Sequence, residues 1–548
     1  MLKRFSRQLA DATASFASPL NSVNSWWQFV GVVGLLATAT VFRIWKIESA
    51  PGVNGDEAWM GIQAQRWLSG STVEWRTPTG NPMNVFFFLP QAALHAVWTP
   101  SIGLLRTPAV LSGLAALFVN YYLARRAIGG IAAVVSTIGL AILPINIAYS
   151  RFAWDACQTV LFTAPVVFMS LLTVVETNRS RQWTAAAVVA LAVAVLVHPT
   201  NIFLTPFVVA SSAYRWRKEI LSAIDRIRAA SHLRFVARAM AWTGLVVAVI
   251  VGVCLMKPRA WMIARRATSL SQSGQFVQGY GRLFSGITAY RFISGGRLPS
   301  ESPRWWADWD WYDGVSWLMA GVMVYGLIRR LGEDRPAERC FVVSWLLSVL
   351  IFYMIAGPGA LAPHYERYGM CLVLPTVLAL SLGLAWWMER PGNASLTARC
   401  MGLAIGALML ASFYQNYFAI FERTGGTSHP TFRTAAVEPK VAAFRLIAAQ
   451  ASDERRGRIR SAEWWNVLPL RYLAFGNADL DVEEWDEAHL LSLLAAPSIN
   501  QQIWFVEFTD GRPAAFLRRT LGRERIHWSE TMFVAPNGRP ILSVFVVK

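Results

Sequence analysis

The sequence contains few charged residues and few cysteines. Charged residues make up 15% of its 548 positions, against about 25% in an ordinary soluble protein, whereas 54% of the residues are hydrophobic. This composition excludes a chain that is wholly water-soluble and predicts long membrane-spanning segments. The five cysteines lie in or beside apolar stretches and lack the spacing of zinc ligands, so we expect neither a disulfide framework nor a cysteine metal site.

The net charge of +18 is distributed in a way that argues against nucleic acid as a partner. From Glu422 to the C-terminus the basic and acidic residues nearly balance, so the positive excess lies in the apolar part, mostly in short links. Basic links between apolar runs are typical of membrane topology. Many of the 25 tryptophans, such as Trp26-Trp27 and Trp386-Trp387, stand where apolar runs meet polar ones, as expected for a headgroup layer.

Eleven apolar runs are long enough to cross a bilayer, since a spanning helix needs about 20 residues. They begin near residues 26, 104, 128, 157, 183, 200, 239, 314, 340, 369 and 399. A twelfth run, Pro82 to Trp98, is shorter and contains Pro90. If it does not cross and the N-terminus is inside, five basic links become cytoplasmic together. Four are short, at Arg125-Arg126, Arg179/Arg181, Arg329 to Arg339 and Arg390 to Arg399, and the longest runs from Arg215 to Arg238. We therefore predict a polytopic α-helical membrane protein with about eleven spans and an extracytoplasmic C-terminus.

The predicted topology divides the chain into three parts. They are a cytoplasmic segment 1–25, a transmembrane domain 26–421 with outer loops at about 46–103 and 257–313, and a soluble extracytoplasmic α/β domain 422–548. In the first loop, helical spacing of Met60, Ala64, Trp67 and Leu68 predicts a helix lying flat at the membrane surface.

Alternating and helical patterns also predict the elements of the C-terminal domain. We expect a helix over 437–451, an acidic helix around 483–494, strands over 501–508 and 541–547, and a hairpin turn at Asn537-Gly538.

Carboxylates in two outer segments are the candidate catalytic groups. Asp56 and Glu57 follow the first span, and Asp155 stands in the outer turn after Ser150. A carboxylate in a partly apolar cleft is suited to act as a general base toward a hydroxyl or an amine. The structural alternatives are that Asp56 caps the helix behind it and that Arg151 and Asp155 form a local pair four residues apart. The placement of both aspartates on one face favours the catalytic interpretation.

Basic and polar residues near the same outer face are candidates for binding a phosphate. The candidate residues are Arg151, Arg259, His364, Arg367 and Tyr368. Arginine and histidine at a membrane rim give the charge-assisted, multi-donor contacts that a phosphate headgroup requires. Snorkelling and anchoring explain most rim arginines, and Arg367 stands out because it lies beside a carboxylate in a short turn.

Two further polar patterns carry weaker signals. Asp308-Trp309-Asp310 contains a D-x-D pattern that holds a divalent metal in sugar transferases, but the tryptophans around it are typical of an interface belt. We therefore assign no metal site or cofactor, and a divalent metal ion stays as the alternative. His198-Pro199 is interpreted as the end of a helix with a satisfied imidazole.

Several short motifs recur in one order in a known group of enzymes. They are Gly55-Asp56-Glu57, Leu105 to Gly113, Ala124-Arg125-Arg126, Tyr149-Ser150-Arg151 with Asp155, and Glu366-Arg367-Tyr368. In this arrangement the chain resembles the bacterial GT-C glycosyltransferases of the protein O-mannosyltransferase and lipid A aminoarabinose transferase type (glycosyltransferase family 39-like). The resemblance covers roughly residues 26–390. It departs from the aminoarabinose transferases at Asn81-Pro82, where they have a lysine before the proline.

The resemblance implies a site and a reaction. Asp56 and Asp155 would be catalytic with Glu57 beside them, and Arg367 would contact the phosphate of a polyprenyl-phosphate-sugar donor. An outward-facing site has no nucleotide-sugar pool, so a donor delivered through the membrane is also expected on physical grounds. We predict a glycosyltransferase of the bacterial inner membrane that acts with inversion on an extracytoplasmic lipid, glycan or protein, with Asp56 as general base.

Two other functions remain as alternatives. A transporter or flippase would carry ionisable groups or broken helices near the midplane, and the predicted spans have almost none. A polymerase or ligase of lipid-linked glycans would share the donor chemistry and the site.

Overall fold

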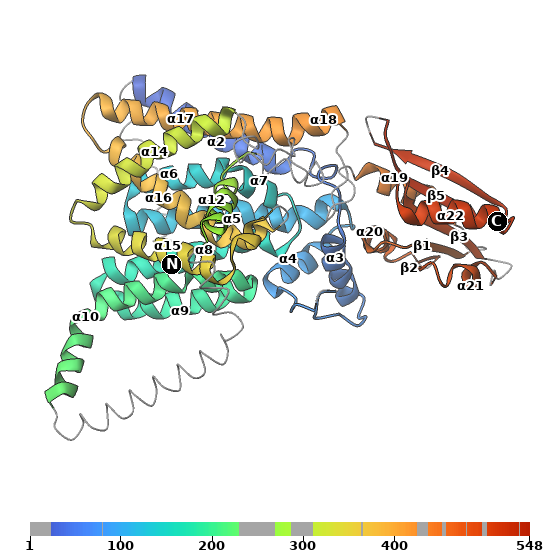
Figure 1. Cartoon of the computed structure of the whole chain (residues 1–548), viewed down its shortest axis with the longest axis horizontal. Helices are drawn as coiled ribbons and strands as arrows, with labels where there is room; N and C mark the ends of the chain where they lie inside the picture. The colour runs from blue at the N-terminus through green and yellow to red at the C-terminus, as the bar shows by residue number, and fades with distance from the viewer. Residues whose placement is uncertain are drawn as a thin grey trace.

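A computed structural model describes residues 23–78, 80–229, 269–286, 311–362, 365–424, 437–451, 456–477, 479–495, 501–535 and 538–547. Long helices run side by side along the longest axis, and a small α/β domain stands at one end of this bundle (Figure 1).

The apolar runs of the sequence form the bundle. Its helices are α2 (Val23–Ile44), α5 (Ile102–Ile128), α6 (Gly130–Ile142), α8 (Thr159–Val175), α9 (Ser180–Val197), α10 (Thr205–Ala229), α14 (Trp311–Leu331), α15 (Pro336–Ile355), α16 (Met370–Met388) and α17 (Asn393–Phe413). Each coincides with a predicted span, and the run from about 239 lies outside the described residues. Six helices of the described part are long and apolar enough to cross a membrane. The count of eleven spans and their orientation stay predictions.

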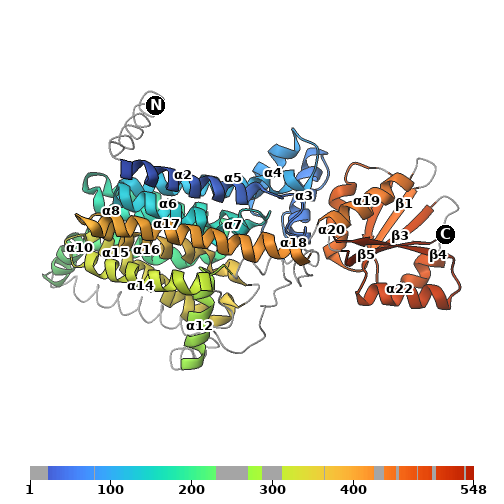
Figure 2. The same ribbon diagram turned by 90° about the horizontal axis from the view of Figure 1, so that it is seen from above.

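The twelfth apolar run forms a short helix, α4 (Val85–His95). Its 11 residues rise only about 16 Å, well short of a hydrocarbon core of about 30 Å. It packs against α3 (Gly55–Leu68), the helix predicted in the first loop, and both lie at the end of the bundle that faces the C-terminal domain (Figure 2). Most of α3 is buried, because α4 and the C-terminal domain cover it.

Polar residues begin the helices at this end. Asn54, Asn84 and Ser101 are the N-caps of α3, α4 and α5, and each side chain accepts a hydrogen bond from a backbone N–H of the first turn. These N–H groups have no partner inside the helix, so the capping residue fixes where each helix starts.

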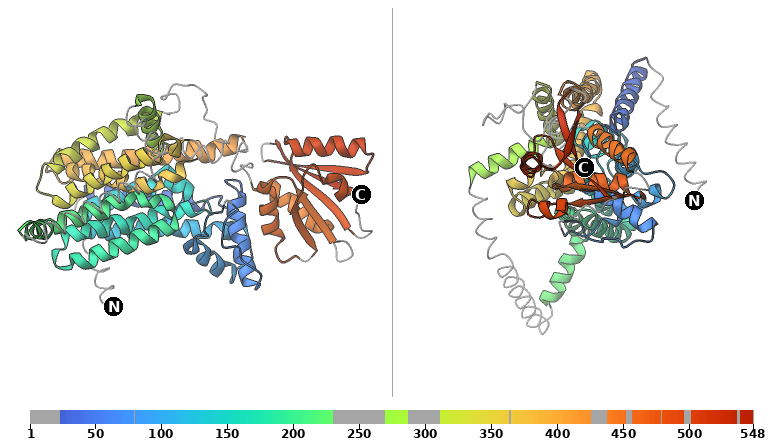
Figure 3. Two further views of the ribbon diagram at one scale, coloured as in Figure 1. Left: turned by 60° about the horizontal axis from the view of Figure 1, so that its bottom comes forward. Right: turned by 90° about the vertical axis from the view of Figure 1, so that its right-hand side faces the viewer.

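The C-terminal domain is a five-stranded sheet with helices on both faces. In the order β2-β1-β3-β5-β4 the strands are Leu480–Glu484, Arg456–Ser461, Gln501–Phe508, Pro540–Val547 and Trp528–Val534. The first three strands are parallel and the last two pairings are antiparallel. α19 (Glu438–Gln450) and α20 (Trp464–Ala474) cover one face, and α21 (Leu490–Ala495) and α22 (Arg512–Arg523) cover the other (Figure 3).

Most of the elements predicted in this domain are confirmed. The expected helix over 437–451 is α19, the expected strands are β3 and β5, and β4 and β5 form the expected antiparallel pair, although Asn537 of the turn lies outside the described residues. The acidic helix around 483–494 is wrong in its first half. Residues 480–484 form β2, because Leu480 and Val482 turn inward in the alternation of a strand paired with β1, and only 490–495 are helical.

Candidate active site

Glu57 anchors the start of α3. Its carboxylate is fully buried and accepts two hydrogen bonds from Arg106 of α5, at 3.0 Å from both Nε and Nη2. The backbone N–H of Ala153 donates to the same group at 2.9 Å, and the N–H of Asn54 completes a capping box. Since both oxygens of Glu57 are engaged by the protein, its contacts suit a positioning role better than direct chemistry. Its bonds join α3, α5 and the turn that carries Asp155.

Asp56, the neighbour of Glu57, is half-buried at the first turn of α3. Burial is the main cause that raises the pKa of Asp56 to about 6, and the charge of Asp155 raises it further while that of Arg367 lowers it. Asn54, not Asp56, caps α3, so the capping alternative for Asp56 is wrong. Asp155 and Arg367 therefore lie within electrostatic reach of Asp56, although the three groups come from three separate segments.

Asp155 begins the short helix η1 (Asp155–Gln158) and is partly exposed. One of its oxygens accepts from the N–H of Ala156 at 2.8 Å. The local pair with Arg151, the structural alternative for Asp155, does not form. Arg151 is fully buried and donates to the carbonyls of Phe42 and Ala50 at 2.5 and 2.9 Å. Arg151 therefore holds the chain that leaves α2, and this placement gives it no open face toward a donor phosphate.

Arg367 lies in η5 (Glu366–Gly369), directly before α16. Its guanidinium is 4.4 Å from the ring of Trp154 and 4.9 Å from that of Tyr368, and it donates to the Tyr368 hydroxyl at 3.2 Å. Within the part of the chain that the structure describes, Arg367 takes part in no salt bridge. An arginine held by aromatic rings, partly exposed and near two carboxylates, is suited to bind an anion.

His198 joins this group, and the sequence interpretation missed it as a site residue. It ends α9 as expected, and its Nδ1 lies 2.7 Å from the hydroxyl of Thr200. Its ring centroid is 6.1 Å from that of Tyr368. Burial lowers the pKa of His198, Asp155 raises it and Arg367 lowers it, so the imidazole faces the same charges as Asp56. The feature of the sequence that could have identified His198 is its position at the predicted outer end of a span.

Arg106 was also missed as a partner of the site. It is fully buried in the first turns of α5, and besides Glu57 it donates to the carbonyls of Ile47 and Gly52 at 2.9 and 3.2 Å. An arginine inside an apolar run requires a partner, and that requirement is the signal in the sequence.

The remaining candidates cannot be compared with the structure. Arg259, His364 and the Asp308-Trp309-Asp310 pattern lie outside the described residues. Among the residues that are described, no group of three or more His, Cys, Asp or Glu side chains is arranged to hold a metal ion.

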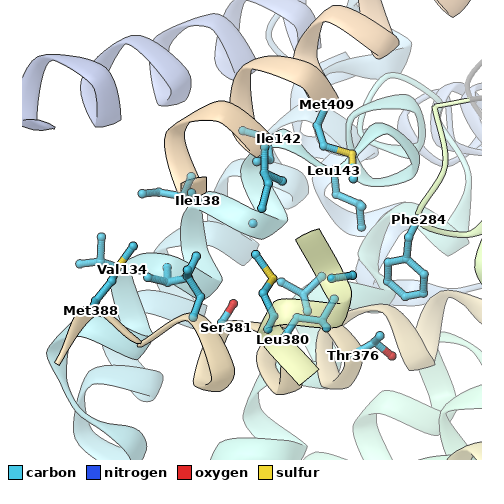
Figure 4. Close-up of a pocket in the computed structure, with 18 of the residues that line it drawn as sticks. Val134, Ile138, Ile142, Leu143, Phe284, Thr376, Leu380, Ser381, Met388 and Met409 are labelled. Carbon is cyan, nitrogen blue, oxygen red and sulfur yellow. The ribbon is translucent and has the colours of Figure 1, made fainter. Parts of the chain in front are cut away.

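A large apolar cavity of about 1070 Å³ lies within the bundle (Figure 4). Residues of α6 such as Ile138 and of α16 such as Leu380 line it, together with Met409 of α17 and Phe284. Asp56, Asp155 and Arg367 do not line it, but Thr376 does, and this residue lies in the first half of the helix that Arg367 precedes. The cavity is therefore separate from the three charged groups, although Thr376 and Arg367 lie nine residues apart at the start of the same helical segment.

Comparison with known proteins finds one matching family model and several solved structures with a similar fold. Residues 84–242 match the family described as dolichyl-phosphate-mannose-protein mannosyltransferase. No curated protein sequence matches the chain. ArnT from Cupriavidus metallidurans bound to undecaprenyl phosphate is similar with a TM-score of 0.52 and 14% identity, covering 95% of this chain and 98% of that chain.

A second similar fold is the oligosaccharyltransferase AglB from Archaeoglobus fulgidus. In complex with an inhibitory peptide and a dolichol-phosphate it gives a TM-score of 0.50 and 11% identity, covering 95% of this chain and 74% of that chain. The Archaeoglobus fulgidus oligosaccharyltransferase tethered with an acceptor peptide gives a TM-score of 0.51 and 11% identity, covering 94% of this chain and 74% of that chain. At these identities the likeness concerns the fold.

Proposed function

We propose that this chain is a GT-C glycosyltransferase of the protein mannosyltransferase and ArnT type, and that it moves a sugar from a polyprenyl-phosphate carrier to an extracytoplasmic acceptor. The observation that carries the proposal is the convergence of Asp56, Asp155 and Arg367 from three segments at one end of the bundle. This set combines a candidate base with a candidate phosphate ligand, which are the two groups that transfer from a sugar phosphate requires.

The donor class has support from both the fold and the cavity. The ArnT structure holds undecaprenyl phosphate and an AglB structure holds a dolichol-phosphate, and both ligands are long isoprenoid chains that end in phosphate. In this chain the phosphate would contact Arg367 and Tyr368. The cavity of about 1070 Å³ is lined mainly by apolar side chains and suits part of the isoprenoid tail.

The reaction we propose is a single displacement that inverts the sugar carbon. The acceptor oxygen forms a bond to the anomeric carbon, and its proton passes to the Asp56 carboxylate. The bond between that carbon and the phosphate oxygen breaks, and the electron pair leaves with the polyprenyl phosphate. Arg367 stabilises the negative charge that develops on the leaving group.

The other residues assist this reaction. Asp155 raises the basicity of Asp56 through its charge, and it is placed to orient the acceptor or the sugar. Glu57 and Arg106 fix the position of Asp56 through their buried pair. We propose a multi-pass protein of a bacterial inner membrane, with the site and residues 422–548 outside the cytoplasm, and an acceptor that is a lipid, a glycan or a protein.

Purified protein with Asp56→Asn tests the proposal. Release of undecaprenyl phosphate from undecaprenyl-phosphate mannose and from undecaprenyl-phosphate aminoarabinose reports turnover even where water is the acceptor. We expect at least about a hundredfold loss, the usual contribution of a general base. The variant should fold, because a half-buried group whose pKa is raised tolerates a neutral isostere.

The matched control is Asp510→Asn, which neutralises an exposed carboxylate of the C-terminal domain that lies 3.7 Å from Arg539. It should retain normal turnover. Undiminished turnover in Asp56→Asn would refute the assignment of the base. The size of the product made in membranes separates transfer of a single sugar from a polymerase or ligase, which would add a whole glycan.

A further inference from the structure

The C-terminal domain packs directly on the helix that carries Asp56. α20 lies against α3, and the approach is close enough to require glycine at two positions of α3. A methyl group on Gly55 would lie 2.2 Å from the ring of Trp464, and one on Gly61 would lie 2.5 Å from the ring of Tyr472. The residue before Asp56 thus touches the soluble domain.

A lysine of the same domain holds the segment that leads into α3. Lys440 of α19 is only 1% exposed, and its Nζ donates to the carbonyl of Val53 at 3.2 Å and to that of Trp465 at 2.6 Å. Its ammonium lies 5.6 Å from the centre of the Phe508 ring. Val53 immediately precedes the N-cap of α3, so one buried cation joins the backbone next to the active site to the first turn of α20.

Other bonds fix the two parts in a single register. The N–H of Val437 donates to the carbonyl of Ser49 at 3.0 Å. The Tyr472 hydroxyl donates to the carbonyl of Ser101 at 3.0 Å and lies 2.9 Å from Nε2 of His95. Docking in a shifted register would separate Lys440 from the carbonyl of Val53. A buried ammonium is costly unless its donors are satisfied, so this loss disfavours other registers.

We propose that Lys440 is a positioning residue for Asp56, so that the C-terminal domain forms part of the catalytic unit. The inference rests on the proposed function, in which Asp56 accepts the proton of the acceptor. Lys440 acts through the backbone of residues 53 and 54, which sets the first turn of α3 and with it the distance of the Asp56 carboxylate from Asp155 and Arg367. A displacement of this turn by about 1 Å is enough to impair proton transfer.

The test compares Lys440→Met with Arg445→Met in the full-length purified protein. Methionine keeps the length of the side chain and removes its donors, and Arg445 is an exposed cation on the same helix. With undecaprenyl-phosphate mannose as the probe, we expect kcat of Lys440→Met to fall about tenfold or more while KM for the donor changes less than about twofold. Arg445→Met should match the wild type in both.

A change in the pH profile separates positioning from a general loss of folded protein. Loosening the segment before α3 admits water to Asp56, so the acid limb of the kcat profile should move to lower pH in Lys440→Met. A smaller amount of folded protein would lower activity equally at every pH. If Lys440→Met does not fold, Gly61→Ala displaces α20 from α3 instead and should show the same shift.

Two outcomes would overturn the inference, and they differ from failure of the proposed function. A folded Lys440→Met with the kcat and pH profile of the wild type, beside an inactive Asp56→Asn, excludes positioning by this lysine. A proportional loss of activity at all pH values excludes it as well. Undiminished turnover in Asp56→Asn would instead refute the catalytic assignment itself.

Discussion

Acidification should switch off the reaction by protonating Asp56. A general base acts only in its ionised form, and burial together with Asp155 raises the pKa of Asp56 to about 6. The rate should therefore be about half-maximal near pH 6 and about one-tenth of maximal near pH 5, with a slope of about tenfold per pH unit below that. An aspartate with its ordinary pKa would keep the rate constant down to about pH 5.

The charges around Asp56 predict the direction in which two variants move this limb. In Asp155→Asn a neighbouring negative charge is lost, so the pKa of Asp56 falls and the acid limb moves to lower pH. In Arg367→Gln a positive charge is lost, so the pKa rises and the limb moves to higher pH. Both variants should also turn over more slowly, so each profile is normalised to its own maximum.

The assay is release of undecaprenyl phosphate from an undecaprenyl-phosphate sugar held well below its KM, between about pH 5 and 8 at constant ionic strength. Under these conditions the rate follows kcat/KM and reports the pKa of the free enzyme. Recovery of activity after return to pH 7 shows that acid has not unfolded the protein. A wild-type rate that stays constant down to pH 5 would refute the raised pKa. Shifts of the same sign in Asp155→Asn and Arg367→Gln would refute the electrostatic coupling of the three groups.

Two predictions concern stability. Glu57→Gln leaves the fully buried Arg106 without its counter-charge and should lower the free energy of unfolding by about 3–5 kcal/mol. Glu176→Gln removes the partner of Arg126 in an exposed pair and should lower it by about 1 kcal/mol or less in the same thermal melts. Equal melting temperatures for the two variants would contradict this. In the C-terminal domain burial raises the pKa of Glu507 to about 8, so the folded state favours its neutral form and stability should fall as pH rises from about 4.5 to 8. Glu507→Gln should remove that loss of stability, which amounts to a gain of about 3 kcal/mol over the wild type at pH 7. Thermal melts of both proteins across this pH range check the prediction. A wild type whose stability does not fall as pH rises would contradict it.

The spans and most of the C-terminal elements could be predicted because their signals are local. A run of about 20 apolar residues forms a helix in a bilayer because its backbone polar groups have no other partners there. The aromatic and β-branched residues of 501–508 favour a strand. The end of the strand at 483–484 was misassigned to a helix because its acidic residues suit a helix surface. It becomes a strand through pairing with β1, which lies about 20 residues earlier in the chain.

The sequence alone predicted a helical membrane protein with a small C-terminal α/β domain, and it identified Asp56, Asp155 and Arg367 as candidates. Only the tertiary structure decided how the polar residues divide their roles. Glu57 and Arg151 resemble site residues in the sequence, yet both are fully buried against partners from distant segments. His198 and Lys440 gain their importance from elements far away in the chain. The physical reason is that composition and periodicity report burial, whereas charge pairing depends on which segments meet, and that is fixed only when the helices pack.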